Sequence, residues 1–135
     1  MSTVESLMSR HVKTLGRNDE LSVADDLMTA GRIRHLPVLD EQGRLAGIVT
    51  QRDLFHSALV RALGFGTAAR DKILQSIVVK NVMTDTVVTT TPDTPLEEAA
   101  GVMLEKKIGC LPVIDAEGVL VGILTESDFV AAAAR

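Results

Sequence analysis

The sequence predicts an α/β fold built from two copies of one unit, and three observations lead to this prediction. The 135-residue chain aligns with itself at an offset of 75 residues, so that Met8 meets Met83 (83 minus 8 is 75). Each copy holds a segment with helical spacing of apolar residues and then two short apolar runs, which favours a helix followed by strands. A turn containing glycine separates the two runs in each copy, as in a β-hairpin.

The repeat is supported by rare residues that stay in register without a gap. Leu36-Pro37-Val38 aligns with Leu111-Pro112-Val113. Further pairs at the same offset are Met28 and Met103, Gly47 and Gly122, and Asp53 and Asp128. Because chance would not keep Pro, Met and Gly in register over such a length, the chain contains an internal duplication. We expect the first unit at residues 1–63, a connecting segment at 64–78 and the second unit at 79–135.

Helical spacing predicts one amphipathic helix in the first part of each copy. In copy two, Thr94 is expected to be the N-cap and Pro95 the first helical residue, with Glu97 three residues after the cap. In copy one, Asp19 takes the cap position. The residues predicted to form the buried faces are Leu21, Ala24, Leu27 and Met28 in copy one, and Leu96, Ala99, Ala100 and Met103 in copy two.

Two strands joined by a hairpin are expected to follow each of these helices. In copy one, the apolar run 36–39 leads to a turn with Gly43, which can adopt the left-handed backbone that a hairpin needs, and then to a run at 45–50. Thr50 is expected to begin a second helix, and a helix over 68–76 to connect the copies. Because one unit alone is small, we expect two units packed through their sheets with pseudo-twofold symmetry.

Composition and charge argue against nucleic-acid-binding and membrane-spanning proteins. The chain has a net charge of −4, three Phe, no Trp and no Tyr, so it offers few groups to neutralise phosphates or to stack on bases. No apolar run is long enough to cross a bilayer. Residues 1–75 hold ten Lys or Arg and nine Asp or Glu, whereas residues 76–135 hold four and nine. An anion should therefore prefer the first half.

Cysteine content and the N-terminus favour a cytoplasmic protein. Cys110 is the single cysteine, which excludes an intrachain disulfide and fits a reducing compartment. The first ten residues contain no apolar stretch of the kind found in secretory signal peptides. We therefore expect a cytoplasmic location.

The residues shared by the copies also resemble a known family. The pattern in copy one is Val4-x-x-Leu-Met8, Val12-x-Thr14, Leu21-x-x-Ala24-x-x-Leu-Met28, Ile33-x-x-Leu-Pro-Val-x-Asp40 and Gly47-Ile48-x-Thr50-x-x-Asp53. This pattern resembles the cystathionine-β-synthase (CBS) domain, and the tandem copies resemble the CBS pair called a Bateman module. The resemblance implies two β-α-β-β-α units with clefts between them that hold AMP, ADP, ATP or S-adenosylmethionine. It also implies a disc-shaped homodimer and a stand-alone regulatory module without a catalytic cofactor, whose partner protein the sequence does not identify.

The Thr-x-x-Asp sequences that follow the last strand of each copy are the main candidates for ligand binding. The candidate residues are Thr50, Arg52 and Asp53 in copy one, and Thr125 and Asp128 in copy two. A helix start favours a phosphate through its backbone N–H groups and its dipole, and Arg52 could add a charge-assisted hydrogen bond. The resemblance implies that the Asp accepts hydrogen bonds from ribose. The same residues also fit a capping box that needs no ligand, so both interpretations stay open.

The two copies differ beside these Thr and Asp residues. Copy one has Gln51 and Arg52 where copy two has Glu126 and Ser127. Copy two therefore lacks a basic residue at this place. We expect the copy-one site to bind phosphate groups better than the copy-two site.

The resemblance implies further residues that line each ligand site. Backbone groups just before the Pro of each Leu-Pro-Val strand are expected to meet the edge of an adenine ring, although such strands can also be plain core. The candidates are Lys13, Thr14, Arg34, His35, Leu36 and Pro37 in copy one, and Cys110, Leu111 and Pro112 in copy two. His35 and Cys110 occupy equivalent positions, and neither has sequence neighbours that would complete a metal site or activate a nucleophile. We expect both to be partly buried.

Two classes of function fit these observations. The first is a regulatory module that binds an adenosine-containing small molecule, and the second is a ligand-free homodimeric interaction module. An enzyme is not expected, because the sequence shows no nucleophile–base arrangement, no metal-ligand cluster and no Gly-x-x-x-x-Gly-Lys loop.

Overall fold

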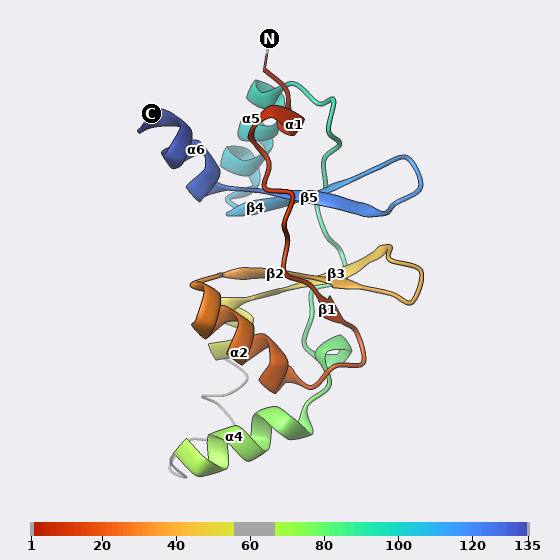
Figure 1. The fold of residues 1–135 in the computed structure, drawn as a ribbon, viewed down its shortest axis with the longest axis vertical. Helices are drawn as coiled ribbons and strands as arrows, with labels where there is room; N and C mark the ends of the chain where they lie inside the picture. Colours follow the sequence, from red (N-terminus) through yellow and green to blue (C-terminus); the bar gives the residue numbers. More distant parts are fainter. Residues whose placement is uncertain (1, 56–66, 135) are drawn as a thin grey trace. The chain divides into compact units, whose positions relative to one another are not determined.

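The computed structural model describes residues 2–55 and 67–134, and the chain divides into two compact units (Figure 1). The central unit comprises Lys13–Val87. The terminal unit comprises Met1–Val12 together with Val88–Arg135. The fold is of the predicted α/β class, and each unit combines a small sheet with helices.

The central unit is built on a three-stranded sheet. Its elements are β1 (Leu15–Gly16), α2 (Leu21–Gly31), β2 (His35–Leu39), β3 (Leu45–Thr50), a helical segment at 51–55, α4 (Thr67–Ser76) and the 3-10 turn η1 (Val79–Asn81). β2 pairs in parallel with β1 and antiparallel with β3. The predicted face of α2 is buried through Leu21, Ala24 and Met28, while Leu27 is partly buried. The connecting helix expected at 68–76 is confirmed as α4.

The terminal unit is built on a two-stranded hairpin. Its elements are α1 (Val4–Leu7), α5 (Leu96–Lys106), β4 (Cys110–Ile114), β5 (Leu120–Thr125) and α6 (Glu126–Ala133). β4 and β5 are antiparallel. The counterpart of β1 is reduced to a single parallel bridge between Thr90 and Val113. From the predicted face of α5, Ala99 and Met103 are buried, whereas Leu96 and Ala100 are partly buried.

The opening segment of each copy pairs with the last strand of the other copy. Ser9 and Ile123 exchange two backbone hydrogen bonds, both 2.9 Å long. Thr84 and Ile48 form the same exchange, again with two bonds of 2.9 Å. Figure 1 shows the result in the terminal unit, where the red segment with α1 runs beside the elements of copy two. Each compact unit therefore contains residues from both sequence copies.

The exchanged segments also fill the hydrophobic cores. Met8 is buried in the core of the terminal unit, and Met83 packs against the core of the central unit. Both members of this repeat pair therefore have a packing role, which suits the flexible side chain of methionine. The division at 1–63, 64–78 and 79–135 follows the sequence copies, whereas the compact units join the first segment of one copy to the body of the other.

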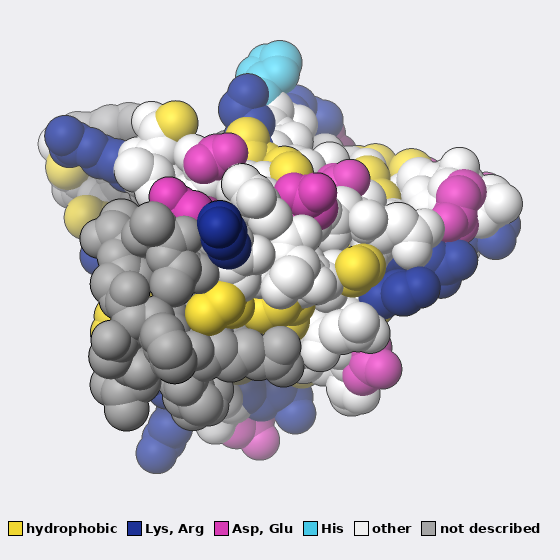
Figure 2. Space-filling view, turned by 90° about the horizontal axis from the view of Figure 1, so that it is seen from below, with side chains coloured by type: hydrophobic (Ala, Val, Ile, Leu, Met, Phe, Trp, Pro, Cys, Tyr) yellow, Lys and Arg dark blue, Asp and Glu magenta, His cyan; other side chains and the backbone are white. Residues whose placement is uncertain are grey.

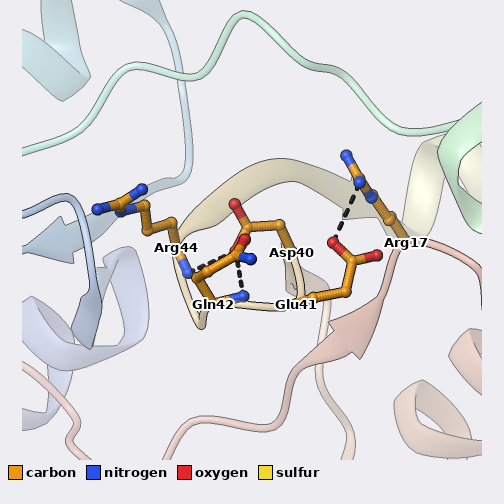
Figure 3. Close-up of polar contacts among 5 residues, drawn as sticks. All are labelled: Arg17, Asp40, Glu41, Gln42 and Arg44. Atoms are coloured by element: carbon orange, nitrogen blue, oxygen red, sulfur yellow. Dashed lines mark hydrogen bonds and ion pairs between the residues drawn. The ribbon is translucent and has the colours of Figure 1, made fainter.

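The hairpin turns form as predicted, and an aspartate organises each of them. Gly43 has a φ of 79° and its counterpart Gly118 a φ of 83°, the left-handed region that favours glycine. The Asp40 Oδ1 atom accepts hydrogen bonds from the backbone N–H groups of Gln42 (2.9 Å) and Arg44 (3.0 Å), as Figure 3 shows. Asp115 makes the equivalent two bonds in the other hairpin. The Asp and Gly shared by the copies thus define the turn.

The start of α5 differs from the prediction. The helix begins at Leu96, its N-cap is Pro95, and no side chain caps it. The hydroxyl of Thr94, the predicted cap, instead lies 2.7 Å from the hydroxyl of Thr91 within the preceding turn. The prediction of a Thr94 cap is therefore wrong, because the turn before the helix uses this hydroxyl.

The start of α2 also differs from the prediction. Its N-cap is Glu20, not Asp19. The Asp19 carboxylate accepts a 2.7 Å hydrogen bond from the backbone N–H of Gly16, three residues earlier. Asp19 thereby closes the turn that leads from β1 to the helix, a role that Asp side chains commonly have.

Candidate ligand-binding corners

The copy-one corner is the turn from β3 into the helical segment 51–55, and Thr50 and Asp53 form a reciprocal pair there. The Thr50 backbone N–H donates to Asp53 Oδ2 at 3.0 Å, and the Asp53 backbone N–H donates to Thr50 Oγ1 at 3.2 Å. Thr50 also pairs with His35 across the sheet, and the Gln51 N–H donates to the Arg34 carbonyl at 2.8 Å. The corner is therefore anchored to β2 by strand pairing and a backbone hydrogen bond.

The copy-two corner, at the end of β5, has the same arrangement. The Thr125 backbone N–H donates to Asp128 Oδ2 at 2.8 Å, and the two side chains complete a capping box at the start of α6. Thr125 pairs with Cys110, and the Glu126 N–H donates to the Gly109 carbonyl at 3.1 Å. The capping interpretation of Thr-x-x-Asp thus holds in both copies.

Capping occupies only one oxygen of each carboxylate, and the second oxygen distinguishes the copies. Asp128 Oδ1 accepts a hydrogen bond of 3.0 Å from the Ser9 hydroxyl. Among the described residues, Asp53 Oδ1 accepts no hydrogen bond. Asp53 is therefore able to accept a further hydrogen bond from a ligand, whereas Asp128 already has a protein donor.

Ser9 is a site residue that inspection of the sequence missed. It lies 119 positions before Asp128, and only the exchange of segments between the copies brings the two together. Its counterpart at the repeat offset is Thr84 (9 plus 75 is 84), which gives no hint that one hydroxyl reaches an Asp. A repeat alignment alone would have placed Ser9 beside Asp53.

Charge also differs between the corners, as the sequence predicts. Arg52 lies in the first helical turn after Thr50 and is exposed. At the same place in copy two, Glu126 and Ser127 are exposed. An anion near the copy-one corner would meet a guanidinium group, whereas at the copy-two corner it would meet a carboxylate.

The side chains of the strand candidates Leu36, Pro37, Leu111 and Pro112 are buried. The Leu36 and Leu111 side chains belong to the two hydrophobic cores, and both prolines that follow them are buried. β1 pairs only with Val38 and Leu39, at the far end of β2 from the corner. The segment 13–14 lies just before this pairing begins, with Thr14 partly buried and Lys13 exposed.

The predicted cleft residues with polar heads differ in exposure. Arg34 is exposed and His35 is partly buried, as expected for His35. Cys110 is buried, and desolvation raises the pKa of its thiol to about 12. A thiol with such a pKa stays protonated near neutral pH and is a poor nucleophile. Cys110 is thus more deeply buried than expected, and its environment fits a packing role.

Three further features of the described residues concern metal ions, membranes and surface charge. Within residues 2–55 and 67–134, no group of three or more His, Cys, Asp or Glu is placed to hold a metal ion. No helix among these residues is both long and apolar enough to cross a membrane. On the face shown in Figure 2, basic and acidic side chains are interspersed, which is unlike the continuous basic surface of many nucleic-acid-binding proteins.

Comparisons of sequence identify relatives of the chain. Residues 4–59 and residues 79–135 each match the family model of the CBS domain. A CBS domain-containing protein of Dictyostelium discoideum is 36% identical over 125 residues, which cover 93% of this chain and 86% of that protein. A homoserine O-acetyltransferase of Methanococcus vannielii is 30% identical over 122 residues. These cover 90% of this chain but only 23% of that longer protein.

Solved structures share the fold over almost the whole chain. A Vibrio cholerae protein described as the acetoin utilization protein AcuB is 40% identical with a TM-score of 0.83, covering 99% of this chain and 91% of that one. CBSX2 of Arabidopsis thaliana, in complex with AMP, is 30% identical with a TM-score of 0.82, covering 99% and 97%.

A third solved structure is the CBS domain pair of protein MJ0100 in complex with 5′-methylthioadenosine and S-adenosyl-L-methionine. It is 27% identical with a TM-score of 0.79, and the match covers 99% of this chain and 97% of that one. Since the family model matches both copies over most of the sequence, the chain belongs to the CBS domain family, as a tandem pair of CBS domains.

Proposed function

We propose that this chain is a non-catalytic regulatory module that binds an adenosine-containing small molecule at the copy-one corner. The observation that carries the proposal is the state of Asp53. One carboxylate oxygen fixes the corner through Thr50, while the other accepts no hydrogen bond from the described residues. A carboxylate held in this way matches the two hydroxyl donors of a ribose ring.

Two neighbouring groups suit the phosphate of an adenine nucleotide. The Thr50 hydroxyl oxygen accepts from the Asp53 backbone N–H, so its own hydrogen remains available to donate to a phosphate oxygen. Arg52, one residue before Asp53, adds a guanidinium that can form charge-assisted and bidentate bonds with phosphate. Ribose and phosphate would thus be bound by three residues of a single turn.

The solved relatives support the choice of ligand class. AMP is bound by CBSX2, and 5′-methylthioadenosine and S-adenosyl-L-methionine are bound by the pair from MJ0100. The common part of these molecules is adenosine, with AMP, ADP, ATP and S-adenosylmethionine as the candidates for this chain. The adenine ring would lie near Arg34 and His35, where β2 begins, with Lys13 and Thr14 close by.

The corresponding site in copy two is proposed to be weaker. Thr125 and Asp128 repeat the corner, and Cys110, Leu111 and Pro112 repeat the strand. However, Ser127 replaces the basic residue and Glu126 adds a negative charge. A ligand with less negative charge than a nucleotide would suit this corner better.

Regulation requires that the ligand bind one conformation or assembly more tightly than another. The match to one segment of a homoserine O-acetyltransferase fits a module that acts on an attached or separate enzyme. We further propose a homodimer in the cytoplasm, with a partner protein that the chemistry of the corner does not identify.

Replacing Arg52 with Ala is expected to weaken AMP binding by about 1.5 kcal/mol, roughly tenfold, because one charge-assisted hydrogen bond is lost. The matched control is Arg17→Ala. Arg17 Nη2 lies 3.1 Å from Glu41 Oε2 beside the hairpin, at the opposite end of β2 from the corner (Figure 3). Isothermal titration calorimetry of both variants measures the difference, and equal affinities would remove Arg52 from the site.

A specific observation also favours the ligand-free interaction module as a second candidate. Phe55 and Val130 occupy equivalent positions in the helices that follow the two corners, and they are 64% and 68% exposed. Apolar side chains repeated at one position suit a contact with a second copy of the chain. This candidate predicts no thermal shift with AMP, ADP, ATP or S-adenosylmethionine, whereas the adenosine-binding proposal predicts stabilisation by at least one of them.

A further inference from the structure

The two corners differ most clearly in what contacts the second carboxylate oxygen. In the terminal unit, the Ser9 hydroxyl donates to Asp128 Oδ1 at 3.0 Å. Asp128 Oδ2 is meanwhile engaged by the backbone N–H and the hydroxyl of Thr125, at 2.8 and 3.3 Å. Both oxygens of Asp128 therefore have protein donors. A ribose hydroxyl would have to compete with them, since each donor reduces what the carboxylate gains from a new bond.

Ser9 is held firmly in the position that allows this contact. Its backbone N–H and carbonyl both bond to Ile123 on β5, at 2.9 Å each. Val4 and Met8, shortly before it, are buried in the core of the terminal unit. The Ser9 side chain can rotate, but its Cα and Cβ atoms stay beside Asp128 unless the backbone pairing with β5 breaks.

The equivalent residue of the central unit does not close its corner. Thr84 has the same two backbone bonds, here with Ile48, at 2.9 Å each. Among the described residues, its side chain makes no hydrogen bond with Asp53, whose carboxylate and backbone N–H bond to Thr50. Ser9 and Thr84 thus have equivalent backbone pairing, but only the Ser9 hydroxyl bonds to the Asp of its corner among the described residues.

We infer that Ser9 is a specificity-determining residue, which lowers the affinity of the copy-two corner for adenosine ligands so that one chain binds a single ligand at the copy-one corner. This inference rests on the proposed function. The charge difference at Arg52 and Ser127 acts in the same direction for nucleotides. Ser9 acts in addition through the ribose contact, which a ligand without a phosphate also makes.

The test measures ligand affinity at each corner separately in the full chain. The two probes are AMP and adenosine, which lacks the phosphate. Wild-type protein is expected to bind about one AMP per chain in calorimetric titration. Asp53→Ala weakens the copy-one site, and because Ser9 lies in the terminal unit, any gain in the remaining binding on changing Ser9 reports on copy two. In this background, Ser9→Ala is expected to strengthen binding of both probes by roughly three- to tenfold, because the ribose no longer competes with the Ser9 hydroxyl for Asp128.

Thr84→Ala in the same background is the matched control. It removes a hydroxyl at the equivalent position of the other unit and is expected to leave copy-two affinity unchanged. Two sites of similar affinity in the wild-type chain, or no gain from Ser9→Ala, would overturn the role of Ser9 and leave adenosine binding itself intact. Absence of binding by the wild type and by every variant would overturn the proposed function, and the inference with it.

Discussion

Replacing Met8 with Ala is expected to destabilise the terminal unit by about 2–4 kcal/mol, because a buried side chain is lost from its core and a cavity is left behind. Met8 is only 8% exposed and packs in a cluster with Val4, Leu111 and Leu124, whose sequence positions lie at both ends of the chain. The repeat-equivalent change, Met83→Ala, is expected to weaken the central unit instead, by a smaller amount because Met83 is partly exposed.

Hydrogen exchange followed by mass spectrometry or NMR shows which of the two units each substitution destabilises. With Met8→Ala, amides of β4 and β5 should lose protection, while those of β2 and β3 should keep theirs. With Met83→Ala, the pattern should be reversed. If Met8→Ala instead exposed β2 and β3, the exchange of opening segments between the copies would be contradicted.

Replacing Gly122 with Ala is expected to lower the free energy of unfolding by about 2–3 kcal/mol, because a new methyl group would overpack the contact between the opening segment and β5. A Cβ built at Gly122 would lie 2.8 Å from Met8 Sδ and 2.9 Å from the backbone oxygen of Ser9. The backbone oxygen cannot move aside easily, because Ser9 is paired with Ile123. The opening segment would have to shift away from the strand.

Denaturant unfolding of Gly122→Ala and Gly101→Ala measures this cost against a matched control. Gly101 lies within α5, and a Cβ there meets nothing within 4 Å. Gly101→Ala is therefore expected to stabilise the protein by about 0.5–1 kcal/mol, the usual gain of Ala over Gly inside a helix. Equal effects of the two substitutions would show that Gly122 is not needed for a close approach.

Most of the local structure could be predicted because local rules determine it. The first hairpin follows from two residues of one turn. Asp40 accepts hydrogen bonds from backbone N–H groups of the turn, and Gly43 adopts the left-handed backbone that the turn needs. The buried faces of α2 and α5 follow from helical spacing, which the cores confirm. The predicted N-caps were wrong at Thr94 and Asp19, because both side chains bond within the turns that precede the helices.

The exchange of opening segments could not be predicted from the repeat. Met8 and Met83 are equivalent in sequence. The residues around them do not determine whether each opening segment pairs with β3 or with β5. The Ser9–Asp128 bond depends on that choice and on the small difference between Ser9 and Thr84. The corners themselves were found from the sequence, but their different hydrogen-bond states were not.

Calorimetric titration of AMP into the wild-type chain and into Asp53→Ala tests adenosine binding at the copy-one corner most directly. The proposal predicts that AMP binds the wild type and that Asp53→Ala weakens this site by about tenfold or more, since the ribose loses its charged acceptor. Because Asp53 also caps the helical segment that follows, the folded state of the variant is checked by hydrogen exchange in β2 and β3. AMP binding of equal affinity in a folded Asp53→Ala variant would contradict the proposal.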